Sequence, residues 1–299
     1  MPQLVLKVMT LNLGGGVKNF TGSPVASAWK TDAILSLISD IQPDVLGVQE
    51  VAQYIDADGT MHSMVDQINA GSSFGNCFYG ETLSMKKHLQ IKKDLMIKGL
   101  FNDWYDWSKG NGLFSRIPFA RLSDGKKDGS PRNVPLFQPL SYEGTRDTDP
   151  RFAILTRLKQ EPYPFLINLH LTTLVGERSK NAWQEVVDAA VIARQQQIAK
   201  VLGLMEEHVL LKGLPFILMG DFNAEPQEYT LRGMLEEEKQ FVRLVPEKAI
   251  DTHVHAGSVD HIFFFPANRL IEYRCRVVNS ETAHAVSDHL PVVADLIIE

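Results

Sequence analysis

Residues 215–226, PFILMGDFNAEP, place an apolar run directly before a carboxylate and an amide. The run, residues 216–219, has the unbroken hydrophobicity that is typical of a short strand buried on both faces. Asp221 and Asn223 follow it, two residues apart. Both residue types also favour tight turns, so an isolated Asp-x-Asn pair predicts only a turn. Its meaning therefore depends on whether similar polar groups follow other strands of the chain.

Apolar runs rich in β-branched residues recur along the sequence and predict further strands. They occupy residues 4–11, 45–48, 112–114, 152–158, 165–171, 259–265, 273–278 and 291–298. Helical spacing predicts helices at 29–39, 178–207 and 234–239. In the longest of these, an apolar stripe is expected to pack in the core: Trp183, Val187, Ala190, Val191, Ile198, Val201 and Leu202. Many strands with few helices favour packed sheets covered by helices over a strict strand–helix alternation.

The composition is that of an ordinary globular protein, with 299 residues, 44% hydrophobic and 22% charged. No Pro/Gly/Ser-rich linker or internal repeat divides the chain, so a single domain spanning residues 1–299 is expected. The opening MPQLVLKVMTLNL resembles neither a signal peptide nor a membrane anchor. Two cysteines without metal-ligand spacing suit free thiols, and a cytoplasmic location is expected. A formal charge of -6 argues against broad coating of nucleic acid.

Polar side chains stand at the ends of most predicted strands. The groups are Asn12, Gln49-Glu50, Asn168-Leu169-His170, Asp221 with Asn223, Asp260, and Asp288-His289. Each one alone is explained by a turn, a solvated strand end or a core histidine. Six groups at strand ends across the whole chain instead predict one site on a shared rim.

The chemistry of this set is specific, because it is rich in oxygen ligands and contains no thiolate. Carboxylate and amide oxygens suit Mg²⁺, or alternatively Mn²⁺, and do not suit a structural zinc. Such a cation takes phosphate oxygens as further ligands. The set therefore predicts metal-assisted hydrolysis of a phosphate ester, with positioned donors stabilising the charge that develops on the phosphoryl group.

In order, the motifs Thr-x-Asn, Gln-Glu, Asn-x-His-Leu, Gly-Asp-Phe-Asn, Val-Asp-His-Ile and Ser-Asp-His resemble the endonuclease/exonuclease/phosphatase superfamily, which includes DNase I. The resemblance runs from Asn12 to His289. It implies an α/β fold of four layers, α/β/β/α, in which two mostly antiparallel sheets pack face to face with helices outside.

The resemblance also implies roles for the residues of the site. Glu50 resembles the principal metal-binding carboxylate, with Asn12 and Asp288 beside or near the metal. Asp221 resembles the residue that orients or deprotonates the attacking water, and Asn223 the one that holds the phosphate or that aspartate.

The two histidines of the motifs resemble phosphate-contacting residues. His289 is expected to contact the scissile phosphate while Asp260 orients it and favours its cation. His170 resembles a second contact, although the position of its carboxylate partner in DNase I holds Asn111 here. Arg151 matches the family arginine at the head of the next strand and is expected to grip phosphate.

Readings from other classes rest on single motifs. Residues 71–75, GSSFG, match Gly-x-Ser-x-Gly, but the helical pattern precedes Ser73 and the extended pattern follows it, the reverse of a nucleophile elbow. His253 and His255 form a His-x-His pair without the regular alternation of a TIM barrel. A catalytically silent binding protein on the same fold would be expected to lack Glu50, Asp221 or His289, and all three are present.

The substrate is less determined than the reaction. A phosphodiester is favoured by analogy with the superfamily, and a phosphomonoesterase of the inositol-phosphate type is the alternative. The segment 83–110 carries six lysines and three aspartates together with aromatic residues. It fits a nucleic acid, a lipid interface, or a folded insertion with solvated lysines. The expected partner is thus a nucleic acid, a nucleotide or a phospholipid head group, and the protein is expected to be monomeric with no transmembrane segment.

Overall fold

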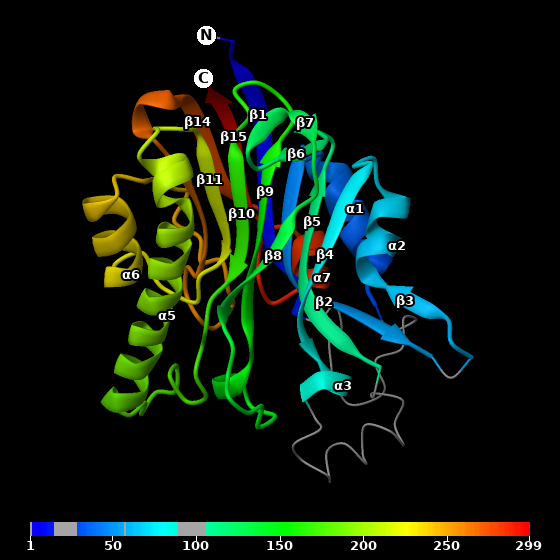
Figure 1. The fold of residues 1–299 in the computed structure, drawn as a ribbon. Coiled ribbons are helices and arrows are strands. Elements are labelled where there is room, and N and C mark those ends of the chain that lie inside the picture. Colours follow the sequence, from blue (N-terminus) through cyan, green and yellow to red (C-terminus); the bar gives the residue numbers. More distant parts are fainter. Residues whose placement is uncertain (1, 15–28, 57, 89–105) are drawn as a thin grey trace.

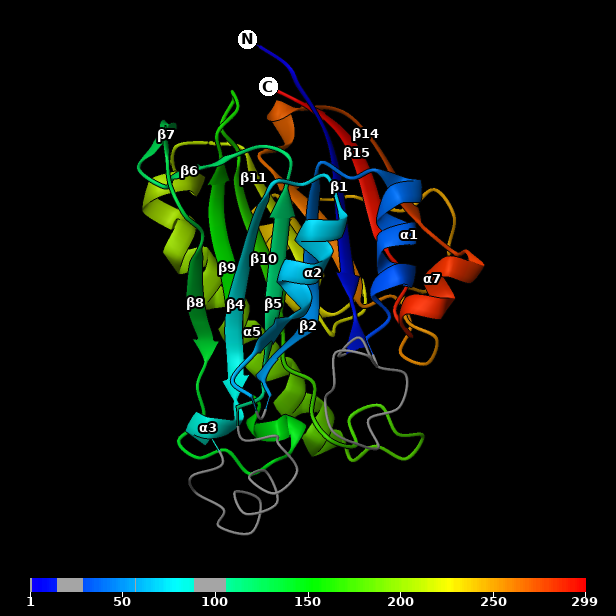
Figure 2. The ribbon, with the colours of Figure 1, turned by 90° about the vertical axis from the view of Figure 1, so that its right-hand side faces the viewer.

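A computed structural model describes residues 2–14, 29–56, 58–88 and 106–299. Two β-sheets form the centre of the molecule, and helices cover their outer faces (Figures 1 and 2). This arrangement confirms the predicted four-layer α/β/β/α fold. Most of segment 83–110, the basic and aromatic insertion, lies outside the described residues.

The first sheet contains seven strands, with β3 (Met61–Ser63) paired to β2 at its side. Its main order is β14 (Leu270–Val277), β15 (Val292–Ile298), β1 (Leu4–Asn12), β2 (Val45–Ile55), β5 (Ser108–Ser115) and β4 (Asn76–Ser84). Within it, β1 and β2 are parallel and the other pairs are antiparallel.

The second sheet contains eight strands, with β8 (Arg132–Phe137) paired to β9. Its order is β12 (Val242–Arg243), β13 (Asp260–Phe265), β11 (Phe216–Asp221), β10 (Phe165–His170), β9 (Arg151–Leu158), β6 (Phe119–Arg121) and β7 (Asp124–Asp128). Only β10 and β11 run parallel among the described pairs of this sheet.

The helices lie outside these sheets. On the first sheet, α1 (Thr31–Ile41), α2 (Met64–Gly71) and α7 (Glu281–Val286) share one apolar layer with the strands. On the second, α5 (Gln184–Met205), α6 (Tyr229–Leu231) and the π-helical segments Glu206–Leu210 and Arg232–Glu238 share another. Short elements complete the fold: α3 (Met85–His88) and the 3-10 turns Arg146–Thr148 and Ala267–Arg269. Among the described residues, no helix combines the length and the apolar character needed to cross a membrane.

Alternation along the strands builds a third apolar layer between the sheets. In β11, Phe216 and Leu218 face the α5 side, whereas Ile217 and Met219 face the opposite sheet. Both faces of the strand are therefore buried, as its unbroken apolar run predicts. Helix α2 precedes Ser73 and strand β4 follows it, so no nucleophile elbow forms there.

The long helix departs from the prediction in one respect. It begins at Gln184, not at residue 178, and its N-terminal half runs past the strand ends (Figure 1). Val201 and Leu202 are buried as expected, but Trp183 is 77% exposed and Val187 is only partly buried. The prediction of a continuous core stripe is therefore wrong for the first part of the helix, where no sheet lies beneath it.

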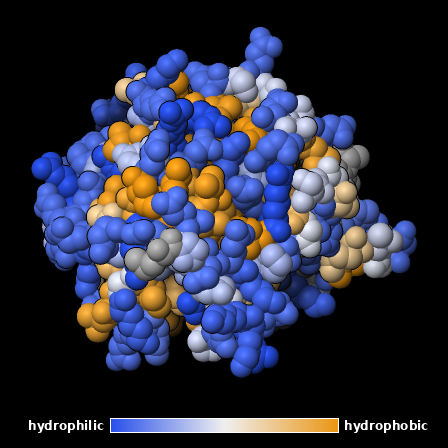
Figure 3. All heavy atoms as spheres, turned by 90° about the horizontal axis from the view of Figure 1, so that it is seen from above, coloured by the Kyte–Doolittle hydropathy of each residue, from blue (hydrophilic) through white to orange (hydrophobic). Residues whose placement is uncertain are grey.

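The two ends of the sandwich differ in character. The end that carries both termini shows hydrophobic atoms gathered in the middle of a hydrophilic surface (Figure 3). At the opposite end, β1, β10 and β11 finish and β13 begins, so their polar terminal residues share one rim. The candidate chemistry lies at this rim.

Candidate active site at the rim of the sheets

Strand register aligns three of the predicted residues side by side. In the parallel pair of β10 and β11, His170 is the partner of Asp221, and in the antiparallel pair of β11 and β13, Asp221 is the partner of Asp260. All three are buried, with 7%, 1% and 2% of their surface exposed. Three adjacent strands thus fix these side chains on rigid backbone.

Asp221 is held from two directions. Asn12 Nδ2 donates to its Oδ2 at 2.9 Å, and the backbone N–H of Asn223 donates to its Oδ1 at 2.9 Å. Asn12 lies on the first sheet, so this bond joins the two sheets at the rim. Burial, with help from the nearby Asp260, raises the pKa of Asp221 to about 6, although His289 and the donated hydrogen bonds oppose that shift. The carboxylate is thereby made more basic than an exposed one.

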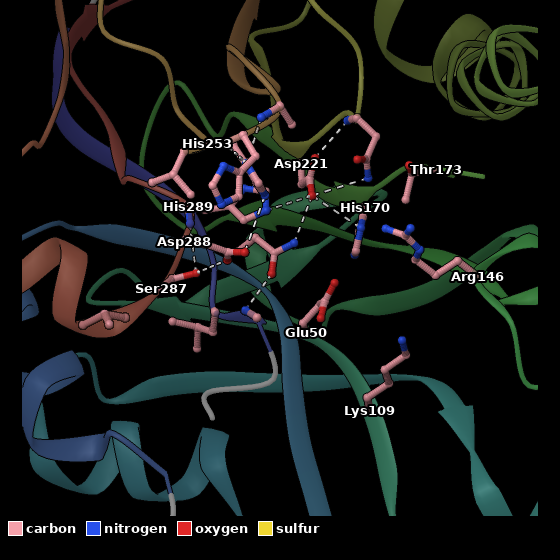
Figure 4. A pocket seen from close by; sticks show the side chains of 18 of the residues that line it. Glu50, Lys109, Arg146, His170, Thr173, Asp221, His253, Ser287, Asp288 and His289 are labelled. Atoms are coloured by element: carbon pink, nitrogen blue, oxygen red, sulfur yellow. Dashed lines mark hydrogen bonds and ion pairs between the residues drawn. The ribbon is translucent and has the colours of Figure 1, made fainter. Parts of the chain in front are cut away.

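His289 is oriented by the carboxylate of Asp260. Its Nδ1 donates to Asp260 Oδ2 at 2.8 Å, and its Nε2 lies 3.9 Å from Asp221 Oδ2. Burial disfavours the cation, but Asp260 and then Asp221 outweigh it and raise the pKa of His289 to about 10. An imidazolium with one N–H fixed on a carboxylate presents its other N–H to the cavity (Figure 4).

His170 differs from His289 although both lie near Asp221. Its Nε2 is 3.4 Å from Asp221 Oδ2, but burial and the positive charges of Arg151 and Lys109 hold its pKa well below the usual value. We therefore treat His170 as neutral in the free protein, and the contact with Asp221 as one without a formal positive charge.

Glu50 lines the cavity from an irregular part of strand β2. It sits at an irregularity of β2 between Val48 and Val51, in the left-handed conformation with φ of 56°. Such strain in a residue other than glycine is characteristic of functional positions. Among the described residues, none is found in a hydrogen bond or ion pair with its carboxylate, which faces the cavity (Figure 4).

Glu50 shares a cavity of about 760 Å³ with Asn12 and Asp288. Asn12 Oδ1 accepts one hydrogen bond, from the N–H of Gly14, and Asp288 is exposed at the cavity wall. This set of oxygen atoms fits a hard divalent cation. The tightest described groups of possible ligand atoms are different ones, Asp221–Asp260–His289 and His253–Asp288–His289. Neither of those groups includes Glu50.

Arg151 and Asn111 are both buried and share one small hollow. Arg151 is 5% exposed, lines the cavity and has a buried Nε without a hydrogen-bond partner in the described part of the chain. Asn111 is 1% exposed and donates from Nδ2 to the carbonyl of Phe152 at 2.9 Å. It lines only a small side hollow shared with Glu50, Arg151 and His170. Asn223 lines the main cavity, and its side-chain Nδ2 donates to the carbonyl of Leu171 at 3.1 Å.

Several residues of the cavity were not identified from the sequence. They include Lys109, Arg146 and His253. Arg178 donates to the carbonyl groups of Asn223 and Ala256, at 2.8 and 2.7 Å, and so ties two loops of the rim together. His253 belongs to the His-x-His pair. No local sequence pattern shows that it lies beside Asp288. A polar residue shortly before the 259–265 strand was the one available signal.

The family model for the Endonuclease/Exonuclease/phosphatase family matches residues 9–289. The chain belongs to this family. The match confirms the resemblance drawn from the six motifs, and the family is one of hydrolases that act on phosphate esters, generally with a divalent metal. No curated protein matches the chain in sequence.

Solved structures share the fold at low sequence identity. An endonuclease/exonuclease/phosphatase from Beutenbergia cavernae DSM 12333 is 18% identical, with a TM-score of 0.67, over 98% of this chain and 72% of that one. The human Nocturnin catalytic domain with bound sulfate is 16% identical, with a TM-score of 0.61, over 100% and 97%. A mannosyl-6-phosphatase from Bacteroides thetaiotaomicron VPI-5482 is 16% identical, with a TM-score of 0.59, over 97% and 99%. At these identities the likeness establishes the fold alone.

Proposed function

We propose that the protein hydrolyses a phosphodiester by attack of water on phosphorus, with Mg²⁺ or Mn²⁺ as cofactor. The observation that carries this proposal is the position of Asp221 between a cationic histidine, His289, and a neutral one, His170, in the cavity that also holds Glu50. A basic carboxylate, a cationic donor and a metal-type carboxylate with no partner among the described residues are the parts that metal-assisted hydrolysis of a phosphate ester requires.

Asp221 orients the attacking water and accepts its proton. Its pKa of about 6 suits this task, because a base works best when its pKa lies near the operating pH. Asn12 and the backbone of Asn223 each occupy one carboxylate oxygen, which fixes the direction of the remaining lone pairs. The side chain of Asn223 supports the loop at the same time.

His289 binds a phosphoryl oxygen through its Nε2–H. Its charge is maintained by Asp260, and the fixed Nδ1–H bond keeps the ring aimed at the cavity. Arg151, on the other side of His170, supplies a second positive charge to the phosphate, while neutral His170 acts as a further contact. These groups stabilise the negative charge of the transition state without rearranging.

Glu50 would hold the metal ion, with Asn12 and Asp288 beside or near it. The strain at Glu50 and the absence of a described partner for its carboxylate support this assignment. The bound cation would neutralise charge on the phosphoryl oxygens.

The dimensions of the site support a diester over a monoester. The main cavity of about 760 Å³ shares Arg178, Asn223, His255 and Ala256 with a second hollow of about 460 Å³ beside α5. The phosphorus of a bound ester would therefore have room for a substituent on either side. Nucleic acids, nucleotides that contain a phosphodiester and the head groups of phospholipids all meet this requirement.

Substrate assays test the proposal. A diester such as bis(4-nitrophenyl) phosphate, and the monoester 4-nitrophenyl phosphate, would be offered with Mg²⁺, Mn²⁺ or EDTA, followed by DNA, RNA, nucleotides and phospholipids. We expect turnover of a diester that EDTA abolishes and that Glu50→Gln and Asp221→Asn each reduce at least 100-fold. The exposed Asp251→Asn serves as control. Activity that persists in EDTA would refute the metal, turnover of monoesters alone would favour the phosphomonoesterase, and partner capture without turnover would favour a silent binding protein.

A further inference from the structure

His253 is fixed at the edge of the cavity by the loop that contains it. The backbone N–H groups of His255 and Ala256 both donate to its Nδ1, at 2.9 and 3.0 Å. The loop is anchored at each side, because His253 forms isolated β-bridges with Gly257 and with His289. The ring is thus held by the chain's own backbone. The proposed mechanism gives it no role so far.

These two hydrogen bonds define the tautomer of the ring. A backbone N–H can only donate, so the nitrogen that receives it must present a lone pair. Nδ1 of His253 is therefore unprotonated, and the proton of the neutral ring is on Nε2. His289 has the reverse arrangement, because its Nδ1 donates to the carboxylate of Asp260.

The tautomer argues against His253 as a metal ligand. A cation bound at Nε2 of a neutral imidazole needs the proton at Nδ1, where it would collide with the N–H groups of His255 and Ala256. The cluster of His253, Asp288 and His289 is therefore not a metal site while the loop has this conformation. Its Nε2 carries a hydrogen-bond donor.

The Nε2–H of His253 has only a long contact among the described residues. Its described contact is Asp288 Oδ2 at 3.5 Å, the outer limit for a hydrogen bond. The ring packs edge-to-face against His289, with centroids 4.4 Å apart, and 17% of its side chain is exposed at the cavity (Figure 4). A ligand oxygen beside His289 would offer the Nε2–H a closer acceptor.

We propose that His253 is a substrate-binding residue whose Nε2–H donates to an oxygen of the scissile phosphate next to His289. The identity of the ligand rests on the proposed function, whereas the tautomer does not. A neutral donor at this position adds a hydrogen bond without placing a second imidazolium against His289. In this arrangement His289 contributes a positive charge to the phosphate, and His253 contributes a neutral hydrogen bond of fixed direction.

Two substitutions separate this role from a structural one. In His253→Asn, the side-chain Oδ1 replaces Nδ1 as acceptor for the loop, but no donor reaches the position of Nε2. In His253→Gln, the amide nitrogen reaches that position, but the acceptor near the backbone is lost. The exposed His208→Asn, distant in the fold on the segment after α5, is the control.

We expect His253→Asn to keep the wild-type Tm while kcat/KM falls about 10- to 100-fold, the loss of one hydrogen bond to a charged acceptor. The Kd for inorganic phosphate, measured by calorimetry on the Mg²⁺-loaded protein, should rise by a similar factor, with unchanged Kd for Mg²⁺. His253→Gln should recover part of both losses. If the Asn variant lowers the Tm, the Gln variant decides: recovery supports the proposal and no recovery overturns it.

The proposal is overturned if His253→Asn binds phosphate as tightly as the wild type, or if it weakens Mg²⁺ binding. Long-range ¹H–¹⁵N spectra of histidine-labelled protein give an independent readout. The signal that disappears in His253→Asn should have the pattern of an Nε2–H tautomer, and an Nδ1–H pattern would contradict the assignment. Should no ester be hydrolysed while the Asn variant still weakens phosphate binding, the proposed function fails and this inference stands.

Discussion

At the scale of the single residue, the partner of one ring nitrogen determines what each buried histidine can do. His289 faces a carboxylate and gains a proton, whereas Nδ1 of His253 faces two backbone N–H groups and stays unprotonated to accept their hydrogen bonds. His170, buried beside Arg151, stays neutral because a cation there would be both desolvated and repelled. Three similar side chains thus acquire distinct protonation patterns from their surroundings.

Asp260→Asn tests the control of His289. An amide in place of the carboxylate removes the negative charge that maintains the imidazolium and allows the ring to turn. We expect kcat/KM to fall at least 100-fold, as for the loss of a positioned acid–base partner, with little change in Tm. Asp251→Asn, which changes an exposed carboxylate on the loop before β13, should be neutral. Equal activity of both variants would remove Asp260 from the mechanism.

His261 predicts the response of the fold to acid. It is buried, its Nε2–H donates to the carbonyl of Ala224 at 3.0 Å, and burial lowers its pKa to about 4 despite that bond. Between its unfolded pKa near 6.5 and about 4, the unfolded chain binds more protons than the native one. The free energy of unfolding should therefore decrease as the pH is lowered from about 6.5 to about 4, by about 3 kcal/mol from this residue alone.

The matched variant is His261→Gln, which retains a donor for Ala224 but does not titrate. Urea unfolding at pH 7, 5.5 and 4.5 should show a smaller loss for this variant than for the wild type. The exposed His208→Gln should lose as much stability as the wild type does. Parallel curves for all three proteins would show that His261 does not contribute to acid sensitivity.

At the scale of the element, strand β2 shows how a small irregularity builds a site. The sequence predicts a strand at residues 45–48 followed by Gln49 and Glu50, whereas the strand continues to Ile55 through a register shift. The sequence identified the residue but not the bulge, because no glycine marks the left-handed position. A bulge at this point turns Glu50 out of the ladder and towards the cavity.

Glu50→Gly is expected to leave stability unchanged or raise it by up to about 1 kcal/mol, since glycine adopts a positive φ without a steric penalty. The same variant should lose its affinity for Mg²⁺. In Gln53→Gly, at a regular position of the same strand, glycine should lower stability by about 0.5–1 kcal/mol. Urea unfolding without metal provides the comparison. An equal loss in both variants would mean that Glu50 is not strained.

Helix α5 shows what periodicity cannot supply. The apolar spacing correctly predicted the helix and the burial of Val201 and Leu202, but it could not show where the sheet beneath them ends. Val187 and Val191 line the hollow beside the candidate site instead of the core. Amphipathic spacing indicates which face is apolar, and the tertiary structure determines what that face meets.

At the scale of the whole molecule, the order of motifs carried more information than any pattern of hydrophobicity. The strands themselves were predictable, whereas their assignment to two sheets was not, because period-two alternation does not encode pairing partners. The N-terminal strand β1 lies between β2 and the C-terminal strand β15, so strands from the two ends of the chain pair directly. The six polar groups were identifiable from the sequence because they stand at the ends of strands. The place of His253 at the site could be found only from the three-dimensional conformation of its loop.

The two sheets are in tight contact at Gly47, and this contact makes their packing testable by a single substitution. Asn168, on the second sheet, donates to the carbonyls of Val48 and Gly112 on the first and accepts from Gln49 Nε2 at 2.6 Å. A Cβ at Gly47 would lie 2.7 Å from Asn168 Oδ1 and 2.6 Å from Met219 Cε. Asn168 cannot withdraw without disturbing this bridge, and its partner Gln49 directly precedes Glu50 along β2.

We therefore expect Gly47→Ala to lower the free energy of unfolding by about 1–3 kcal/mol, as overpacking of a closed core does, and to reduce kcat/KM through displacement of Glu50. Gly203→Ala is the control, because this helical glycine is exposed with nothing within 4 Å of an added Cβ, and should gain up to about 1 kcal/mol. Urea unfolding and turnover of the same diester measure both effects. If Gly47→Ala keeps full stability and activity, the sheets are not tightly packed at this point, and their contact there does not determine the positions of the residues at the rim.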